Sequence, residues 1–427
     1  MPWIRLLLTL IFVTTTVAAA EITIVAPAEI LHDAELQVRI TGLTSSAKYD
    51  VQSDFVTHGG SIWRSTATFV ADDRGTIDLS TATPVSGSWE KADPHAFIWS
   101  MAKTKEIPST TAVLESDDQS VITVTVMQDG KKLAERRITL IKRATGISTT
   151  EIRGPLVGTL FVPYGKAPLP AVIVLGGSEG GINRDRAALI ASHGYATLAL
   201  AYFGIAPLPN ELDRIPVETI DRAVEWLAAQ PSVDRKRIAI MGGSKGAELA
   251  LLAAANNRAI RAVIAFAPSS VVFQSITAGP SNRSSWTLRG HEMPFAPYVS
   301  SDTFTKSHRL VDLYDPTLAA ATAATAIPVE KINGPILLLA GKDDALWPSA
   351  AMAAQIVDRA TRMHFTYPIT NLMLDAAGHH VATLPNRPTA DSIRLGGTAS
   401  GLAEAQLRSW KAIFDFLGSA LAVPRSR

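Results

Sequence analysis

After Pro170 the sequence carries a series of short, almost uninterrupted apolar runs. They are AVIVL (171–175), ATLALA (196–201), RIAIM (237–241), RAVIAFA (261–267) and PILLLAG (335–341). Runs of this kind are typical of parallel strands that are buried on both faces. Helical patterns lie between them, as in residues 218–229, where Ile220, Val224 and Leu227 recur on one face. The alternation predicts a mostly parallel, doubly wound α/β sheet with helices on both sides.

The residues before this region, from Glu21 to about Lys142, follow a different pattern. Short runs of alternating polar and apolar residues are separated by turn residues, as in ELQVRITGL, HAFIWSM and SVITVTVMQDGKKLAERRITLI. Such runs are typical of antiparallel strands, and about seven of them make an immunoglobulin-like sandwich. The pair Asp129-Gly130 is expected to form a two-residue hairpin turn, because glycine tolerates a positive φ.

We therefore expect two domains after an N-terminal segment. Residues 21–145 form the all-β sandwich, and residues 146–427 form the α/β domain. Residues 269–330 break the strand and helix rhythm with proline, serine and asparagine, so we expect an inserted cap there. The sandwich contains no set of catalytic side chains, and we expect it to shape one side of the substrate entrance.

The first twenty residues have the pattern of a secretory signal peptide. Arg5 precedes an apolar stretch at residues 6–13, and small residues follow it, ending in three alanines at 18–20. The apolar stretch is much shorter than the roughly 20 residues that a membrane-spanning helix needs. We expect cleavage, export to the periplasm or the medium, and no stable membrane span in the mature chain.

Composition excludes several classes of function. The chain has 40 Lys and Arg against 39 Asp and Glu, a formal net charge of +1, so no basic field would attract nucleic acid. It has no cysteine, which excludes disulfides, cysteine-ligated metal sites and a cysteine nucleophile. No nucleotide-binding glycine motif and no HExxH motif is present. We expect a small-molecule substrate, no nucleic acid, no cofactor and no metal.

The candidate nucleophile follows one of the apolar runs. RIAIM is followed directly by Gly242-Gly243-Ser244-Lys245-Gly246 and then by the helix-forming AELALLAAA. A sharp turn from strand to helix requires glycine on both sides of the serine, because a Cβ atom there would collide with neighbouring backbone. Such a turn holds the serine hydroxyl at the carboxyl edge of the sheet. The motif predicts Ser244 as a nucleophile; the alternative is a serine in a tight structural turn.

A serine hydroxyl reacts only when a base takes its proton and a carboxylate orients that base. In α/β-hydrolases the acid follows the nucleophile in the chain. Asp343 and Asp344 come directly after PILLLAG, and adjacent side chains at a strand end cannot both point inward. We favour Asp344, three residues after Gly341, and keep Asp343 as the alternative.

The base is expected on a loop beyond the last strand. Residues 363–368, MHFTYP, have the character of a late strand, and a loop ending in Gly378-His379-His380 follows. We favour His379 as the base because it comes directly after the permissive Gly378, and His380 is the alternative.

Acyl chemistry also requires donors for the developing oxyanion. One is expected to be the backbone amide of Lys245, the residue after the nucleophile. The second is expected from the glycine-rich loop at residues 176–181, where the amide of Ser178 or of Glu179 would serve.

Together these segments resemble the acyl-CoA thioesterase and bile acid-CoA:amino acid N-acyltransferase family. The resemblance rests on ADDRGTIDLSTATPVSGSW, HAFIWSM, GGSKGAELAL, ALAYF, IPVEKINGPILLLAGKDDALWPS, AGHH and GGTASGLAEAQLRSWKAIFDFL. It implies an immunoglobulin-like domain followed by an α/β-hydrolase domain. It also implies a catalytic serine, acid and histidine at Ser244, Asp344 and His379.

The resemblance also implies what the enzyme does. Acyltransferases of the family are similar at the serine turn but carry cysteine there, so the serine of this chain favours hydrolysis of an acyl thioester. Coenzyme A is a cytosolic cofactor, and an exported member could instead act on non-CoA esters, as carboxylesterases and dienelactone hydrolases do.

Overall fold

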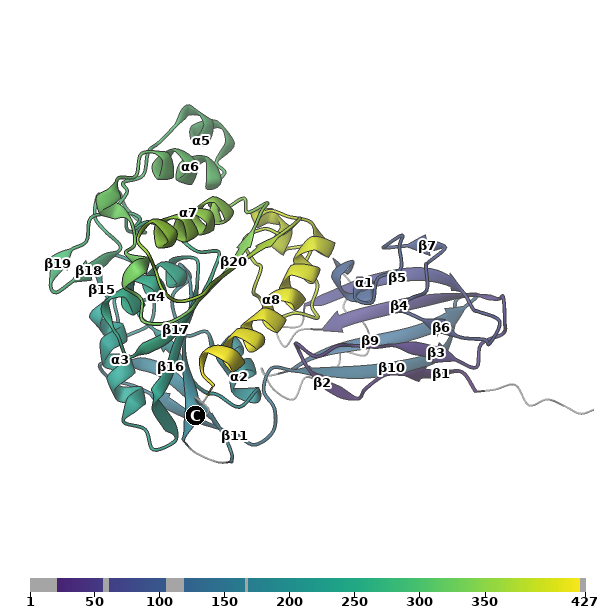
Figure 1. The fold of residues 1–427 in the computed structure, drawn as a ribbon. Helices are drawn as coiled ribbons and strands as arrows, with labels where there is room; N and C mark the ends of the chain where they lie inside the picture. Colours follow the sequence, from purple (N-terminus) through teal and green to yellow (C-terminus); the bar gives the residue numbers. More distant parts are fainter. Residues whose placement is uncertain (1–20, 57–60, 105–118, 166–167, 423–427) are drawn as a thin grey trace, which may run out of the picture.

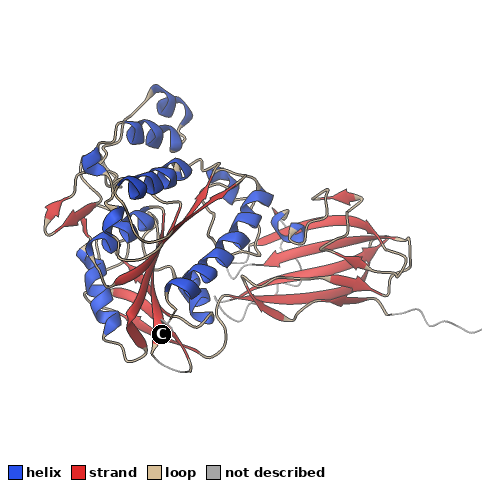
Figure 2. Ribbon diagram, viewed as in Figure 1, coloured by secondary structure: helices blue, strands red, loops and turns tan. Residues whose placement is uncertain are grey.

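A computed structural model describes residues 21–56, 61–104, 119–165 and 168–422 (Figure 1). The chain folds into a β domain and an α/β domain, as Figure 2 shows by the separation of the strand-rich part from the part that carries the long helices. The predicted signal peptide at residues 1–20 lies outside the described residues. None of the helices in the described ranges is long and apolar enough to cross a bilayer.

The β domain consists of two sheets in the described residues. The smaller sheet has the order β1 (Thr23–Val25), β3 (Arg39–Thr41) and β6 (Ile77–Asp78). The larger sheet has the order β2 (Glu29–Leu31), β10 (Lys131–Ile141), β9 (Gln119–Gln128), β4 (Lys48–Val56), β5 (Ile62–Val70) and β7 (Ser86–Gly87), and β8 (Ala102–Lys103) pairs with β5. Their inward faces form one apolar core, which includes Ile40, Phe69 and Val124. The immunoglobulin-like character expected from the sequence is confirmed.

The hairpin between β9 and β10 turns at the predicted pair. Asp129 has φ 48° and Gly130 has φ 75°, both in the left-handed region that a two-residue hairpin of this kind uses.

One predicted strand of this domain is wrong. HAFIWSM contains the short helix α1 (Ala96–Trp99) instead. Asp93 starts the turn, since its carboxylate accepts a hydrogen bond from the amide of His95 at 2.8 Å. Ala96, Phe97 and Ile98 are consecutive and all buried, which a strand with alternating side chains does not achieve on a two-layer core.

The α/β domain is built on one eight-stranded sheet. Its order is β11 (Ile147–Ile152), β12 (Val157–Pro163), β14 (Ala196–Ala201), β13 (Leu169–Leu175), β16 (Val233–Gly243), β17 (Ile260–Phe266), β20 (Ile336–Gly341) and β21 (Ile369–Leu374). β11 and β12 are antiparallel to their neighbours, and the remaining pairs are parallel. The predicted mostly parallel sheet is confirmed.

Helices cover both faces of this sheet. α3 (Glu218–Ala228), α4 (Lys245–Asn256) and α7 (Ser349–Arg362) pack in one apolar cluster, on one face. α2 (Arg184–Ser192) and α8 (Ala399–Ala420) pack in a second cluster, on the other face. The central strands are buried on both sides for this reason, which accounts for their unbroken apolar runs.

Residues 269–330 form an insertion beside the sheet. It contains β18 (Trp286–Leu288), β19 (His291–Glu292), α5 (Asp302–Ser307), α6 (Val311–Ala319) and two 3₁₀ turns, η1 (Ala323–Thr325) and η2 (Val329–Lys331). β15 (Ile215–Pro216) pairs with β18, and Figure 1 shows α5 and α6 beyond α7 at the top of the molecule.

The predicted late strand at residues 363–368 is also wrong. The last strand is β21, which begins at Ile369, directly after Pro368. Proline has no N–H to donate to a strand ladder. The chain before it completes α7, since the amide of Met363 donates to the oxygen of Arg359 and that of Phe365 to the oxygen of Ala360.

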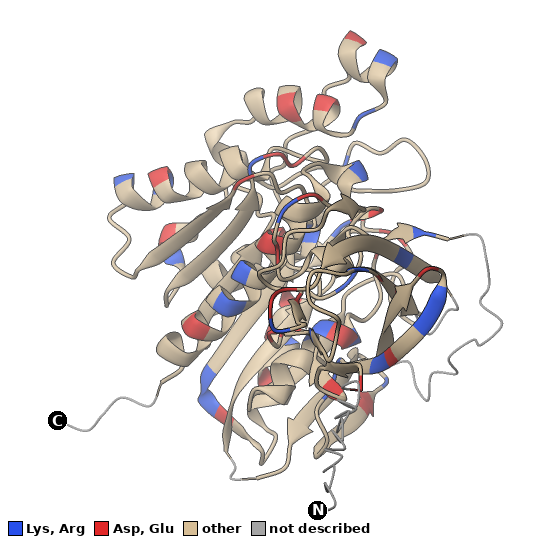
Figure 3. Ribbon diagram, turned by 90° about the vertical axis from the view of Figure 1, so that its right-hand side faces the viewer, with Lys and Arg blue, Asp and Glu red and all other residues tan. Residues whose placement is uncertain are grey.

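The two domains meet through polar contacts. His193 Nε2, at the end of α2, lies 2.8 Å from Asp33 Oδ2. His32 Nδ1 lies 2.9 Å from the backbone oxygen of Pro385, and the side-chain amide of Asn386 donates to the backbone oxygen of Ala34 at 2.8 Å. Figure 3, which views the molecule from the side of the β domain, shows charges of both signs spread over the ribbon.

Candidate active site

Ser244 lies in a strained turn between β16 and α4. Its backbone has φ 55° and ψ −124°, a conformation that costs free energy for a residue with a side chain. A Cβ atom on Gly242 would overlap the oxygen of Gly246, and one on Gly246 would overlap the oxygen of Gly176. The glycines that the sequence pattern singled out are therefore required by close backbone packing around the serine.

The structure pairs Asp344 with His379. Asp344 Oδ2 lies 2.8 Å from His379 Nδ1, and the two side chains are 2% and 8% exposed. The same carboxylate accepts hydrogen bonds from the amide of Leu346 at 2.9 Å and from Ser349 Oγ at 2.6 Å. These donors stabilise the charged carboxylate and fix its orientation toward the imidazole. Asp343, the alternative acid, is exposed.

The neighbouring His380 has a different environment. Its Nδ1 atom is buried without a hydrogen-bond partner in the described residues. Burial, and secondarily the nearby His379, lowers the pKa of His380 to about 4. A carboxylate therefore orients His379 and not His380.

Ser244 and His379 line the same cavity, about 500 Å³ in volume. Within the described part of the chain, no hydrogen bond joins Ser244 Oγ to His379 Nε2. Catalytic hydrogen bonds are often long in a substrate-free site and tighten when substrate binds.

The glycine-rich loop at residues 176–181 lies beside the serine. Ser178 lines the 500 Å³ cavity and also a second cavity, and Ser244 lines both. The amides of Ser178 and Lys245 donate to no acceptor in the described residues, as an oxyanion site requires. Glu179 also lines the first cavity, and its carboxylate accepts a hydrogen bond from the amide of Gly177 at 2.9 Å.

Tyr202 fixes this loop from the neighbouring strand end. Its hydroxyl donates to the oxygen of Gly177 at 2.8 Å and lies 3.1 Å from that of Gly176. It comes from the segment ALAYF, and burial raises its pKa well above the ordinary value, so it remains a donor.

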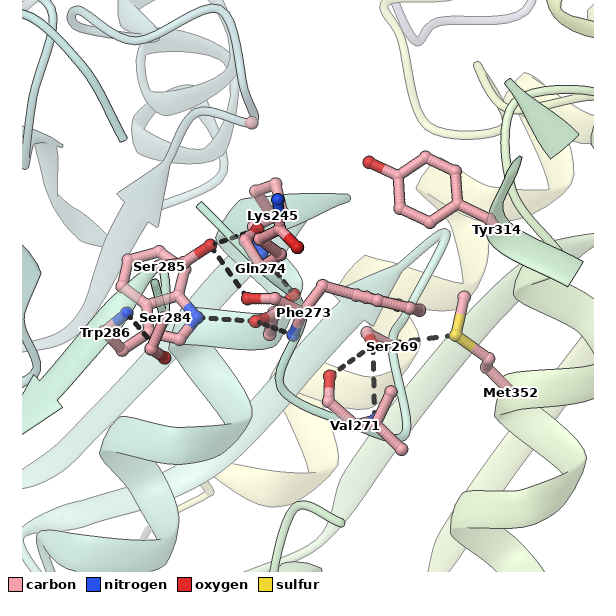
Figure 4. A network of polar contacts seen from close by, with 12 residues as sticks. Lys245, Ser269, Val271, Phe273, Gln274, Ser284, Ser285, Trp286, Tyr314 and Met352 are labelled. Carbon is pink, nitrogen blue, oxygen red and sulfur yellow. Dashed lines mark hydrogen bonds and ion pairs between the residues drawn. The ribbon is translucent and has the colours of Figure 1, made fainter. Parts of the chain in front are cut away.

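The second cavity, about 410 Å³ in volume, lies under the insertion. Its walls are neutral apart from Lys245, and they include Gln274, Ile276, Leu313, Tyr298 and Tyr314. Figure 4 shows the segment from Val271 to Gln274 held by Ser269 and Ser285. Ser285 Oγ donates to the oxygen of Gln274 at 3.0 Å, and Ser269 Oγ donates to that of Val271 at 2.6 Å. The described residues that line the two cavities all lie between 177 and 395. The expectation that the sandwich shapes one side of the entrance stays a prediction.

The side chain of Lys245 has a structural partner. Its Nζ lies 2.7 Å from Glu248 Oε2, and both side chains are almost fully buried. Glu248 also accepts hydrogen bonds from Trp286 Nε1 at 2.6 Å and from the amide of Phe273 at 3.0 Å. The pair therefore ties the first turn of α4 to the insertion, while the backbone amide of Lys245 has no acceptor in the part of the chain that the structure describes.

Sequence reasoning missed several of these residues. Lys245 and Glu248 stand three apart, a spacing that favours an ion pair on a helix and was a usable signal. Ser349 and Tyr202 gave no signal, because a single hydroxyl in an apolar or helical run is common. Arg186, a buried arginine in the first cavity, was also not singled out. In the described ranges no group of three or more His, Asp or Glu side chains is arranged to hold a metal ion.

A mostly parallel sheet with a strained serine turn after a central strand, covered by helices on both faces, defines an α/β-hydrolase. Family models identify the branch. The N-terminal region model of acyl-CoA thioester hydrolases and bile acid-CoA:amino acid N-acyltransferases matches residues 33–154, and the corresponding C-terminal model matches residues 215–423. The chain belongs to the acyl-CoA thioester hydrolase and bile acid-CoA:amino acid N-acyltransferase family, and it is an enzyme of the thioester hydrolase class.

Curated relatives align with nearly the whole chain. The peroxisomal succinyl-coenzyme A thioesterase of Mus musculus is 27% identical, over 92% of this chain and 95% of its own length. The bile acid-CoA:amino acid N-acyltransferase of Mus musculus is 28% identical, over 92% of this chain and 96% of its own. Acyl-coenzyme A thioesterase 6 of Homo sapiens is 26% identical, over 90% and 93%.

Solved structures are more distant in sequence. A dienelactone hydrolase-like promiscuous phosphotriesterase from metagenomic libraries is 18% identical with a TM-score of 0.43, over 65% of this chain and 100% of its own. A puromycin-hydrolyzing peptidase of Mycobacterium tuberculosis is 13% identical with a TM-score of 0.45, over 93% of this chain and 67% of its own.

Proposed function

We propose that this enzyme hydrolyses acyl-CoA thioesters through Ser244, His379 and Asp344, with an acyl-enzyme intermediate. The observation that carries the proposal is the buried Asp344–His379 pair, at 2.8 Å, beside the cavity that the strained Ser244 also lines. The coenzyme A leaving group is proposed because the relatives of this chain include coenzyme A thioesterases.

In the first half of the reaction, Ser244 Oγ attacks the thioester carbonyl carbon and His379 Nε2 takes the hydroxyl proton. Asp344 Oδ2 accepts the hydrogen bond from Nδ1–H, which fixes the tautomer that leaves Nε2 free as a base. The oxyanion forms between the amide of Lys245 and that of Ser178 or Glu179. The carbon–sulfur bond then breaks, and the proton on His379 goes to the leaving sulfur.

In the second half, a water molecule attacks the acyl-serine and His379 takes its proton. The serine–acyl bond breaks, the proton returns to Ser244 Oγ, and the product is a carboxylic acid. An acyl-serine is an oxygen ester, which reacts more slowly with amines than the thioester of an acyl-cysteine would. The chain has no cysteine, and this supports hydrolysis in preference to transfer to an amino acid.

The proposal includes export of the mature enzyme, from the signal-peptide pattern of residues 1–20. Export also favours the second candidate function, hydrolysis of non-CoA esters as in carboxylesterases or dienelactone hydrolases. Fractionation of cells expressing the full chain, with N-terminal sequencing of the product, tests this part. Retention of an uncleaved chain in the cytosol would contradict it.

The catalytic proposal is tested on the purified chain with and without Ser244→Ala. Wild-type enzyme should hydrolyse an acyl-CoA, and Ser244→Ala should lose on the order of 10⁵-fold or more in kcat with an unchanged melting temperature. A fluorophosphonate probe should label the wild type and not the variant. A matched p-nitrophenyl ester gives the comparison between candidates: a kcat/KM far higher for the ester than for the acyl-CoA would favour the second one. Full activity of Ser244→Ala would reject both.

A further inference from the structure

Arg186 is a buried cation in the wall of the catalytic cavity. It stands in the first turn of α2, is 8% exposed, and lines the 500 Å³ cavity together with Ser244 and His379. No carboxylate in the described residues forms an ion pair with it. Its Nε atom is buried and has no hydrogen-bond partner there, and one terminal nitrogen lies 3.5 Å from the oxygen of Ala382, at the outer limit of a hydrogen bond.

Such an arrangement is unfavourable unless something else binds the guanidinium. Removing a cation from water costs several kcal/mol, and arginines inside proteins are normally paired for this reason. Burial lowers the pKa of Arg186 to about 10, against the opposing effect of the nearby carboxylates of Glu179 and Asp185, so the group remains charged near neutral pH. Glu179 lines the same cavity, but in the described residues neither carboxylate forms an ion pair with the guanidinium. The guanidinium lies 4.4 Å from the ring centroid of Phe266, a contact that supplies part of the missing stabilisation without satisfying the N–H donors.

Phe266 places this cation close to the nucleophile. Phe266 pairs with Gly243 in the ladder between β16 and β17, and a Cβ atom on Gly243 would overlap its ring. Ser244 is the next residue. One aromatic ring therefore separates the guanidinium from the backbone that carries the nucleophile, and both face the same cavity.

We propose that Arg186 anchors an anion subsite for the substrate. This inference rests on the proposed function and specifies its substrate. Part of the substrate carries a carboxylate or a phosphate, which accepts two hydrogen bonds from the N–H groups of the guanidinium. The short path to Ser244 favours a carboxylate on the acyl chain, a few bonds from the reacting carbonyl. A phosphate of a coenzyme A leaving group has the same chemistry but stands at the far end of the pantetheine arm. The cavity under the insertion, whose walls are neutral apart from the Glu248-paired Lys245, takes the other part of the substrate.

The test crosses acyl charge with leaving-group charge. Glutaryl and pentanoyl thioesters have the same chain length and differ in a terminal carboxylate, and each is made with coenzyme A and with uncharged N-acetylcysteamine. Four proteins are compared: wild type, Arg186→Gln, Arg186→Lys and Arg184→Gln. Arg184 is the matched control, an exposed arginine on the same helix that pairs with Glu151 at 3.0 Å.

If Arg186 binds a carboxylate on the acyl chain, Arg186→Gln loses its preference for glutaryl over pentanoyl substrates. With the N-acetylcysteamine thioesters, the ratio of the two kcat/KM values then falls at least about tenfold, as loss of a charged hydrogen bond implies. If Arg186 binds a phosphate of coenzyme A, the ratio of kcat/KM for the coenzyme A thioester to that for the N-acetylcysteamine thioester falls in Arg186→Gln instead. Arg186→Lys keeps part of the selectivity, and Arg184→Gln keeps all of it. If both ratios in Arg186→Gln stay within about threefold of the wild-type values, the anion subsite is overturned. The proposed function still stands in that case, provided that the wild type hydrolyses pentanoyl thioesters.

A binding measurement removes the dependence on turnover. Glutarate or inorganic phosphate should raise the melting temperature of the wild type and of Arg184→Gln, and not that of Arg186→Gln. Because the buried cation lacks an ion pair, Arg186→Gln itself should melt no lower than wild type. A lower melting temperature with unchanged substrate ratios would make Arg186 a structural support for the loop at Ala382, and would overturn the proposal.

Discussion

The side-chain amide of Asn386 donates a hydrogen bond to the backbone oxygen of His32 at 2.9 Å, across the junction of the two domains. Asn386 stands seven residues after His379, on the same loop. The β domain therefore supports the segment that carries the proposed general base, although none of its described residues lines either cavity.

Removing this support should reduce catalysis. Asn386 has φ 54°, so Asn386→Gly keeps the backbone conformation and deletes only the amide, while Asn386→Ala adds strain. We expect Asn386→Gly to lose about 1–3 kcal/mol of stability and several-fold in kcat, because the loop is less well fixed. Denaturant unfolding and steady-state kinetics measure the two effects. If Asn386→Gly is less stable than the wild type but has the same kcat, the contact between the domains does not contribute to catalysis.

The two adjacent aspartates form a matched pair for mutation. Asp344→Asn should lower kcat by about 10⁴-fold, since an amide favours the wrong imidazole tautomer at His379. Asp343→Asn changes an exposed carboxylate one residue away and should leave kcat within about twofold of wild type, because exposed substitutions have small effects. Equal losses in the two variants would contradict the assignment of the acid.

Replacing Gly246, the glycine after Lys245, should reduce activity. Gly246→Ala pushes a methyl group against the oxygen of Gly176, so the loop that supplies the second oxyanion donor must move. We expect kcat to fall on the order of 10²-fold, the usual effect of losing one such donor. Gly418→Ala is the control: nothing lies within 4 Å of its Cβ position, and in α8 it should stabilise by about 0.5–1 kcal/mol. Normal turnover in Gly246→Ala would show that the loop is not part of the site.

His32 should make stability depend on pH. Burial lowers its pKa from 6.5 to about 4 in the folded state, so the unfolded chain binds the proton more readily. The stabilisation is complete above pH 6.5 and is lost progressively as the pH falls from 6.5 toward 4, by about 3 kcal/mol at most. His32→Asn should melt with a shallower pH dependence over this range. An identical slope in both proteins would assign the acid sensitivity to other groups, such as His380.

Much of the α/β domain was predictable because its signals are local. Unbroken apolar runs follow from strands buried on both faces, and the glycines around Ser244 follow from backbone contacts within one turn. The choice within each of the two adjacent pairs, Asp343 and Asp344 and then His379 and His380, was harder. Spacing favoured Asp344 and His379, and in the structure these two side chains pair, with hydrogen bonds from Leu346 and Ser349 holding the carboxylate of Asp344 toward the imidazole. Their catalytic roles stay a prediction.

The failures have both local and long-range causes. HAFIWSM has strand-forming composition, but Asp93 starts a turn that buries three consecutive residues. β11 lies at the edge of the sheet and has no fully buried residue, so it lacks the unbroken apolar run that marks the central strands. Arg186 looked like an ordinary charged residue at the start of a helix, and only the folded chain places it against Phe266 with no ion-pair partner among the described residues.

The junction at His32 and Asn386 also bears on engineering. Excising the hydrolase half would replace the sandwich partners of the oxygen of Pro385 and of the side-chain amide of Asn386 by water, so we expect the loop that carries His379 to be less well fixed in the isolated half. Chimeras that exchange sandwiches between relatives should therefore carry the segment around residues 32–34 with the hydrolase half to which it is fitted.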